Sequence, residues 1–252
     1  MTVVNQSTCE ASWFRPLSRR PLAKFVFVAC EQCHHGRMPS SDEPSVNEVH
    51  TKLNRATYDR IAEQYALHQS QPRQPSEELF SSFERSFISK VPSAGVIADL
   101  GCGPAFDGAR FAAQGFNVVG LDLSAGMLSV ASERLPGRLI QGDLRALPLV
   151  IGQLDAIWNV ASLLHVGEQD TPRVLREFRR VLRDHGTLAL ITARGDGNRF
   201  EKVPYAQDEQ RWFVYRSEQR LLGQLEHAGF QIDFSEQVEG KRSWLTILAR
   251  AM

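Results

Sequence analysis

Apolar positions along the chain follow two periods. From residue 52 they recur at steps of three and four residues, which predicts a helix over about 52–68. After the break at Pro75, a second stretch with the same period carries Phe83 and Phe87. Beyond Pro92, short apolar runs of strand length alternate with amphipathic stretches of helix length. Such alternation is typical of an open α/β sheet with helices on both faces.

The chain beyond Pro92 contains enough apolar runs for a complete sheet. The predicted strands lie at 96–100, 117–121, 138–141, 155–160, 187–192, 230–236 and 244–250. The predicted helices lie at about 105–114, 124–134, 171–183 and 216–228. The third of these helices is expected to have Thr171 as its N-cap and Pro172 in its first turn. The fold class that follows is α/β: a Rossmann-like, doubly wound, seven-stranded and mostly parallel sheet with helices on both faces.

The first 48 residues differ from the rest in composition. They hold three of the four cysteines and a run of prolines, serines and acids at 39–44. We therefore expect residues 1–48 to form an irregular or disordered extension. Residues 49–252 are expected to form one domain, in which N-terminal helices within 49–92 precede a core at 93–252.

Two cysteines of this extension, Cys30 and Cys33, have the spacing of a zinc ligand pair. A closed zinc site needs a second pair of ligands, and only Cys9 and the adjacent His34 and His35 are available nearby. We therefore expect no metal site and interpret the segment as an unstructured extension.

Composition and charge exclude several classes of protein. The 252 residues are 42% apolar and 23% charged, as in ordinary globular domains. Lys plus Arg and Asp plus Glu both number 29, whereas proteins that bind phosphate backbones usually carry a basic excess. The apolar run nearest a terminus, 25–30, is too short for a membrane span or the core of a secretion signal. We expect no nucleic-acid partner, no membrane association and a cytoplasmic location.

A glycine-rich turn follows the first predicted strand and precedes a helix. It contains Gly101 and Gly103, and Asp99 lies two positions before the first glycine. Glycines let the backbone approach a ligand closely, and ligands of open α/β sheets bind at the carboxyl ends of the strands. The turn therefore predicts a site for a nucleoside-type ligand, and Asp99 makes this more specific than two glycines alone.

Acidic residues end the next two predicted strands. Asp122 lies about 20 residues after the glycines, where a carboxylate accepts hydrogen bonds from both hydroxyls of a ribose. Asp143 follows the third strand, where an acid accepts from an exocyclic adenine amine and the N–H of Leu144 serves a ring nitrogen. These positions support a ribose and an adenine in the site.

These residues, in this order, resemble the class I S-adenosylmethionine-dependent methyltransferases, and the resemblance covers about residues 50–250. It implies S-adenosyl-L-methionine as cofactor and a lid helix around Tyr58–Tyr65. The implied cofactor-binding residues are Tyr65, Asp99, Gly101, Cys102, Gly103, Asp122, Leu123, Met127, Asp143, Leu144 and Asn159. The segment 155–166 resembles the fourth strand of small-molecule bacterial members.

The chain departs from the family at a few positions. Ala105 stands where a third glycine is common, and Phe106 follows it. The Asp/Asn-Pro-Pro-Tyr motif of enzymes that methylate base or glutamine amines is missing, because the corresponding stretch begins Trp158-Asn-Val-Ala. The function predicted is therefore in-line transfer of a methyl group to a small-molecule acceptor by a monomer or homodimer. Where the acceptor needs a general base, His165 is the candidate catalytic residue.

Two alternatives stay open. One is a domain that keeps the fold and binds S-adenosylmethionine without transferring a methyl group. The other is a nicotinamide-linked oxidoreductase, which Phe106 disfavours because it would crowd the pyrophosphate turn. The acceptor pocket is expected between the lid helix, the segment after Trp158 and the insert at 194–215.

Overall fold

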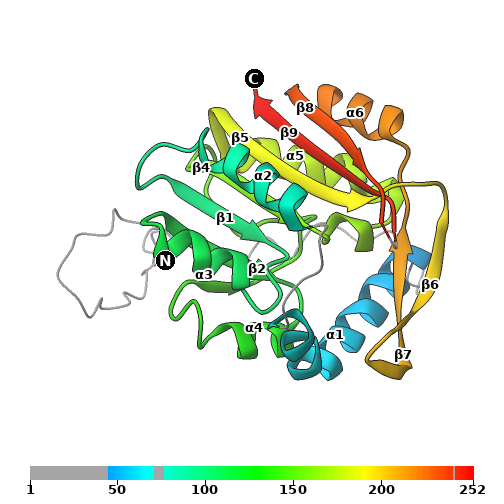
Figure 1. Cartoon of the computed structure of the whole chain (residues 1–252). Helices are drawn as coiled ribbons and strands as arrows, with labels where there is room; N and C mark the ends of the chain where they lie inside the picture. Colours follow the sequence, from blue (N-terminus) through cyan, green and yellow to red (C-terminus); the bar gives the residue numbers. More distant parts are fainter. Residues whose placement is uncertain (1–44, 71–76, 241) are drawn as a thin grey trace, which may run out of the picture.

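The computed structural model describes residues 45–70, 77–240 and 242–252 (Figure 1). Most of the predicted extension 1–48, with Cys9 and the Cys30–Cys33 pair, lies outside the described residues. The core is a seven-stranded sheet with the order β3-β2-β1-β4-β5-β9-β8. Its strands are β1 Val96–Leu100, β2 Asn117–Asp122, β3 Leu139–Gln141, β4 Leu154–Val160, β5 Leu182–Ala193, β8 Phe230–Val238 and β9 Trp244–Ala251.

The sheet is mostly parallel. The pairs β1–β2, β1–β4, β2–β3 and β4–β5 are parallel, and β9 runs antiparallel between β5 and β8. From β1 the chain proceeds outward to β2 and β3 and then returns to β4 on the other side of β1. The predicted fold class is confirmed. This reversal opens a crevice at the carboxyl ends of β1 and β4, which is where ligands bind in such sheets.

Helices cover both faces of the sheet (Figure 1). They are α1 Val46–Ser70, α2 Glu77–Ile88, α3 Phe106–Ala113, α4 Ala125–Ala131, α5 Thr171–Val181 and α6 Glu218–His227, with short 3₁₀ turns at Leu163–His165 and Glu168–Asp170. Successive residues of a strand point to opposite faces. Accordingly, Ala98 of β1 belongs to the core cluster of Phe178 on α5, whereas Ile97 belongs to that of Phe87 and Phe111 on α2 and α3. No helix of the described ranges is long and apolar enough to cross a membrane.

The insert at 194–215 forms a two-stranded hairpin, β6 Asn198–Val203 and β7 Ala206–Val214, that was not predicted. It lies beside α1 at one end of the sheet (Figure 1). The side chain of Asn54 on α1 donates to the carbonyl of Trp212 (2.9 Å) and accepts from its N–H (2.7 Å). One turn further, Thr57 donates to the carbonyl of Gln210 (2.9 Å). Side chains of α1 therefore form hydrogen bonds with backbone groups of β7 that β6, the other strand of the hairpin, leaves unpaired.

The element boundaries differ from prediction at a few points. Helix α1 begins at Val46, ahead of the domain boundary placed after residue 48. Thr171 is the first residue of α5 and not its N-cap, so that prediction is wrong. Its hydroxyl donates to the carbonyl of Gly167 (3.3 Å) and accepts from buried Arg216 (2.9 Å). Strand β5 starts directly after α5, at Leu182, five residues earlier than predicted.

Helices α1 and α4 are in direct contact. One carboxylate oxygen of Asp59 accepts from the Ser124 hydroxyl (2.6 Å) and from the Gly126 N–H (3.0 Å). A Cβ atom added to Gly126 would lie 2.6 Å from the Asp59 carbonyl oxygen. Only glycine therefore lets α1 approach α4 this closely.

We expect Gly126→Ala to lower the free energy of unfolding by about 1–2 kcal/mol, because the methyl group forces α1 away from α4. The matched control is Gly223→Ala in α6, where an added Cβ meets nothing within 4 Å. That change should leave stability unchanged or raise it by roughly 0.5–1 kcal/mol, since alanine favours helix. Denaturant unfolding measures both. If Gly126→Ala were as stable as the wild type, α1 would not press on Gly126.

Candidate functional site

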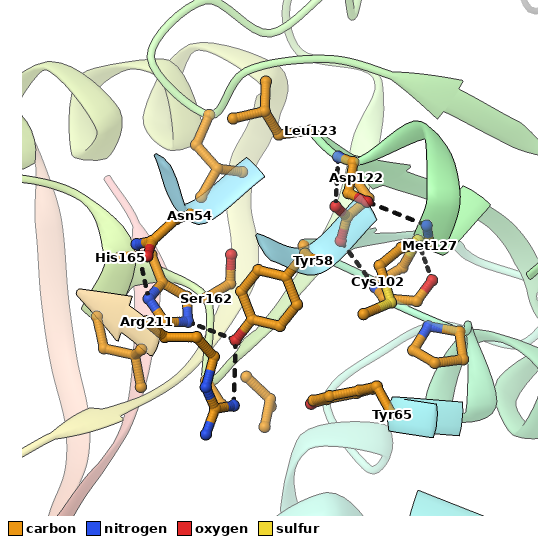
Figure 2. A pocket seen from close by; sticks show the side chains of 18 of the residues that line it. Asn54, Tyr58, Tyr65, Cys102, Asp122, Leu123, Met127, Ser162, His165 and Arg211 are labelled. Carbon is orange, nitrogen blue, oxygen red and sulfur yellow. Dashed lines mark hydrogen bonds between the residues drawn. The ribbon is translucent and has the colours of Figure 1, made fainter. Parts of the chain in front are cut away.

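The carboxyl ends of β1, β2 and β4 form one wall of a cavity of about 750 Å³, which α1 and β7 cover (Figure 2). All but one of the predicted site residues line this cavity. They are Tyr65, Asp99, Gly101, Cys102, Gly103, Asp122, Leu123, Met127, Asp143, Leu144 and His165. Residues from two predicted helices and from the ends of four predicted strands thus meet in one place.

Asn159 is the predicted cofactor residue that does not line the cavity. Its side chain is fully buried, and its amide donates to the carbonyl of Leu100 (2.7 Å). The contact joins β4 to the last residue of β1, next to the glycine turn. The geometry therefore gives the Asn159 amide a structural role in holding the turn in place, and its contact with a cofactor stays a prediction.

The glycine turn after β1 has backbone angles that favour glycine. Gly101 and Gly103 have φ of 76° and 49°. The N–H groups of Gly101 and Cys102 both donate to the carbonyl of Leu121, at 2.7 and 3.0 Å, which fixes the turn to β2. Ala105, which replaces a third glycine, also has positive φ (59°) and is fully buried. This left-handed conformation costs an alanine about 1–2 kcal/mol, so the alanine is accommodated with some strain.

Asp122 at the end of β2 faces both the turn and the cavity. One of its carboxylate oxygens accepts from the N–H of Gly103 (2.9 Å) and the other from the N–H of Ser124 (2.8 Å). Burial raises the pKa of Asp122, while these backbone donors act in the opposite direction. A carboxylate oxygen accepts about two hydrogen bonds, so each oxygen keeps a lone pair for a ligand hydroxyl.

Asp99 is buried beneath the turn. One carboxylate oxygen accepts from the N–H of Gly108 in α3 (3.1 Å). Burial raises the pKa of Asp99 well above its ordinary value, and the negative charges of Asp107 and Asp122 add to this effect. A buried carboxylate of this kind is stabilised by a ligand cation, such as an ammonium group.

Asp143 lies after β3 and is held by Arg145. The guanidinium contacts both oxygens of Asp143, with the shortest distance at 2.7 Å, and also reaches Asp170 at 3.3 Å. Burial raises the pKa of Asp143, but the hydrogen bonds and charge of Arg145 outweigh it and leave the pKa below its ordinary value. Asp143 is therefore ionised and rigidly placed at the cavity wall.

His165 is hydrogen-bonded on both ring nitrogens. Nδ1 lies 2.8 Å from the carbonyl of Trp212 and 3.2 Å from the amide nitrogen of Asn54. Because the carbonyl is the shorter contact and can only accept, we assign the proton to Nδ1, which donates to it. Nε2 lies 2.7 Å from the hydroxyl of Tyr58 and accepts from it (Figure 2). Burial lowers the pKa of His165 to about 3, and the nearby charges of Arg211 and Arg242 act in the same direction. A neutral imidazole whose lone pair is occupied positions Tyr58, so the geometry favours this role over that of general base.

The lowered pKa of His165 predicts a pH dependence of stability. Between pH 3 and the ordinary pKa near 6.5 the unfolded chain binds a proton that the native protein does not. Stability should therefore fall with falling pH in this window, by about 1.4 kcal/mol per pH unit from this group. We expect His165→Asn to flatten the slope, while the same change at exposed His185 leaves it unaltered. Urea unfolding from pH 4 to 8 measures this; parallel curves for all three proteins would contradict it.

Several residues of the site were not singled out from the sequence as site residues. Asn54 and Arg211 line the cavity from α1 and β7, and Ser162 lines it after β4. Tyr58 was assigned to the lid helix but not to the site, and Asp59 fixes that helix to α4. The sequence did contain a signal for the α1 residues, because the polar residues Asn54 and Tyr58 are four positions apart and so lie on one face of the lid helix. Arg211 gave none, because its place depends on the unpredicted hairpin.

Comparison with known proteins agrees with this geometry. Residues 97–186 match the family model described as a methyltransferase domain. A malonyl-acyl-carrier-protein O-methyltransferase of Enterobacter lignolyticus is 31% identical over 143 residues, which are 56% of this chain and 53% of that protein. A 2-phytyl-1,4-naphthoquinone methyltransferase of Synechocystis is 30% identical over 161 residues, which are 57% of this chain and 65% of that protein.

Other similarities indicate the range of the family. An Arabidopsis 18S rRNA (guanine-N7) methyltransferase is 26% identical over 62% of this chain and 54% of its own length. A Burkholderia thailandensis 1,6-didemethyltoxoflavin N1-methyltransferase, solved with that compound and S-adenosylhomocysteine, has a TM-score of 0.64. Its identity is 18%, so the likeness concerns the fold; it covers 85% of this chain and 94% of that one.

The match to the sequence relatives is partial, since it spans between about half and two thirds of the length of each. The range 97–186 that the family model matches contains the glycine turn, Asp122 and Asp143, which line the core side of the cavity. Residues 97–186 are therefore similar to a methyltransferase domain, and the fold of the chain is similar to that of methyltransferases of known structure.

Proposed function

We propose that this protein transfers a methyl group from S-adenosylmethionine to a small-molecule acceptor. The observation that carries the proposal is the convergence of the Gly101–Gly103 turn, Asp122 and Asp143 on one covered cavity. At about 750 Å³ this cavity falls within the range of roughly 300–1,000 Å³ that is common for small-molecule sites.

The residues of the core wall fit the cofactor. The free lone pairs of Asp122 suit the two ribose hydroxyls, and buried Asp99 suits the ammonium group of the methionine portion. An added Cβ on Gly103 would point toward Tyr65, at 3.9 Å, so the turn leaves room between them. Met127, 1% exposed, offers an apolar surface beside the end of β2.

When bound, the cofactor supplies an electrophilic methyl group that needs no activation by the protein. The protein must then hold the acceptor in line with that group and exclude water. Helix α1 and β7 cover the cavity and are fixed to each other by Asn54 and Thr57. Tyr58, oriented by His165, presents its hydroxyl at the end of the cavity away from Asp122 (Figure 2). We place the acceptor at this end.

The covered cavity and the zero net charge favour a small molecule over an RNA, although one relative acts on rRNA. A folded polymer would have to displace α1 or the hairpin to bring its nucleophile to the turn. A cytoplasmic location and a monomeric or homodimeric state stay predictions of the sequence.

Calorimetry with S-adenosylmethionine, S-adenosylhomocysteine and NADH tests the cofactor, and release of S-adenosylhomocysteine with a panel of small acceptors tests transfer. We expect saturable binding of both S-adenosyl ligands and none of NADH. Binding of NADH alone would overturn the proposal. Binding of the S-adenosyl ligands without turnover of any acceptor, or of added rRNA, would favour the silent domain instead.

A further inference from the structure

We propose that the methyl acceptor is a planar organic acid whose anionic group pairs with Arg211. The inference rests on the proposed function and names the substrate class of the same cavity. It comes from the distribution of charge on the cavity wall and from the surroundings of this one guanidinium.

Charges of opposite sign line opposite ends of the cavity. The lining acids are Asp99, Asp107, Asp122 and Asp143, all on the core side. The cavity-lining arginines outside the core wall are Arg55 on α1, Arg211 on β7 and Arg242 just before β9. In Figure 2, Arg211 lies with Tyr58 and His165, away from Asp122 and Met127. The acidic end suits the hydroxyls and amines of the cofactor, and the basic end suits an anion.

Arg211 differs from the other lining arginines because it has no acid partner among the described residues. Arg55 pairs with Asp59 at 3.8 Å, Arg145 with Asp143 at 2.7 Å, and Arg242 with Glu201. The one hydrogen bond that the Arg211 side chain makes within the described ranges goes from Nη1 to the hydroxyl of Tyr58 at 3.4 Å. Its Nε atom is buried and has no partner within the same ranges. A cation withdrawn from water without a counter-ion is costly, and a ligand anion would offset that cost.

The aromatic rings of Phe213 and Tyr58 lie beside the guanidinium and limit the shape of the ligand. The ring of Phe213 lies 5.2 Å from the Arg211 carbon Cζ, and Tyr58, Tyr205 and Trp244 also line the cavity. Flat apolar walls beside a planar guanidinium fork favour a flat ligand with a carboxylate, which the fork binds through two hydrogen bonds.

The cofactor has a carboxylate of its own, so the two sources of an anion must be separated. In Figure 2, Tyr65 and Cys102 lie on the side of the glycine turn and Arg211 lies beyond Tyr58, and the charge of Arg211 also acts on the Tyr65 hydroxyl, lowering its pKa against the effect of burial. This arrangement assigns Arg211 to the acceptor. If it served the cofactor instead, its replacement would weaken binding of S-adenosylhomocysteine.

The test uses the full chain saturated with S-adenosylhomocysteine and three matched probe pairs: benzoate, 4-hydroxybenzoate and indole-3-carboxylate, each against its carboxamide. We expect the wild type to bind at least one acid about tenfold or more tightly than its amide. Arg211→Gln should abolish that preference, Arg211→Lys should keep part of it, and Arg242→Gln should keep it, because Glu201 already balances Arg242. The wild type and the three variants should bind S-adenosylhomocysteine with the same affinity. This measurement also shows that each variant is folded.

Three results would overturn the proposal: no preference for acid over amide in any pair, an unchanged preference in Arg211→Gln, or a loss confined to S-adenosylhomocysteine affinity in that variant. Failure of the wild type to bind S-adenosylhomocysteine would instead contradict the proposed function. The acid and amide pairs would then be compared on the free protein, where Arg211 is still expected to prefer the acids.

Discussion

Replacing Asp122 with alanine should weaken binding of S-adenosylhomocysteine by about 100-fold, equivalent to roughly 2–3 kcal/mol. In the native protein each oxygen of Asp122 accepts one backbone N–H, from Gly103 or Ser124, and keeps a lone pair toward the cavity. Removing the carboxylate leaves the two ribose hydroxyls of the ligand unpaired. It also frees the N–H of Gly103, so the turn loses a constraint at the same time.

Isothermal titration separates these contributions when a second variant is included. Asp122→Asn keeps the size of the side chain and one acceptor oxygen, so an intermediate loss of affinity is expected. Asp208→Ala, an exposed acid of the hairpin, is the control for loss of charge and should bind as the wild type does. If Asp122→Ala bound the ligand as tightly as the wild type, the ribose would lie elsewhere and the assignment of the core wall would be wrong.

The sheet could be predicted from the sequence because its signals are local. Strand β1 is an apolar run that a glycine turn ends, and its predicted bounds match Val96–Leu100. Strand β5 was predicted too short because residues 183–185 are polar and exposed. They extend the strand through backbone geometry that the apolar pattern does not report, including a positive φ at His185 (64°).

The hairpin β6–β7 could not be predicted in the same way. Its strands carry mainly polar residues, such as Arg199, Glu201 and Gln210, and residues 207–210 are mostly exposed. The backbone groups of β7 that it leaves unpaired are satisfied by Asn54 and Thr57, about 150 residues earlier in the chain. A contact across that distance has no signature in local periodicity.

The candidate site also has one part that local sequence signals predict and one part that they do not. The core wall, where we place the cofactor, is built from residues next to strand ends. Backbone topology fixes the position of such side chains, so the sequence predicted these residues. The acceptor end depends on how α1 and β7 pack, so Tyr58 and Arg211 were found only in the structure. Asn159 was assigned to the cofactor from its place in a motif, but the packing of β4 against β1 turns its side chain into the interior.

Gly101→Ala should lower the free energy of unfolding by about 3 kcal/mol or more, which corresponds to a fall in Tm of roughly 6–12 °C. Two costs combine at this position. Its φ of 76° is a conformation that side chains rarely adopt, and an added Cβ would overlap the side chain of Ser162. The turn would have to move away from β4, so cofactor affinity should fall together with stability.

A double-mutant cycle divides the two costs. Ser162→Gly removes the overlapped atoms, so the pair Gly101→Ala and Ser162→Gly should retain only the backbone strain of about 1–2 kcal/mol. Gly137→Ala supplies an independent value for that strain, because Gly137 has φ of 70° and an added Cβ meets nothing within 4 Å. Chemical denaturation of the single and double variants gives the coupling energy. A coupling energy near zero would show that Ser162 does not press against the turn, and that the close approach of β4 to the glycine turn does not hold in solution.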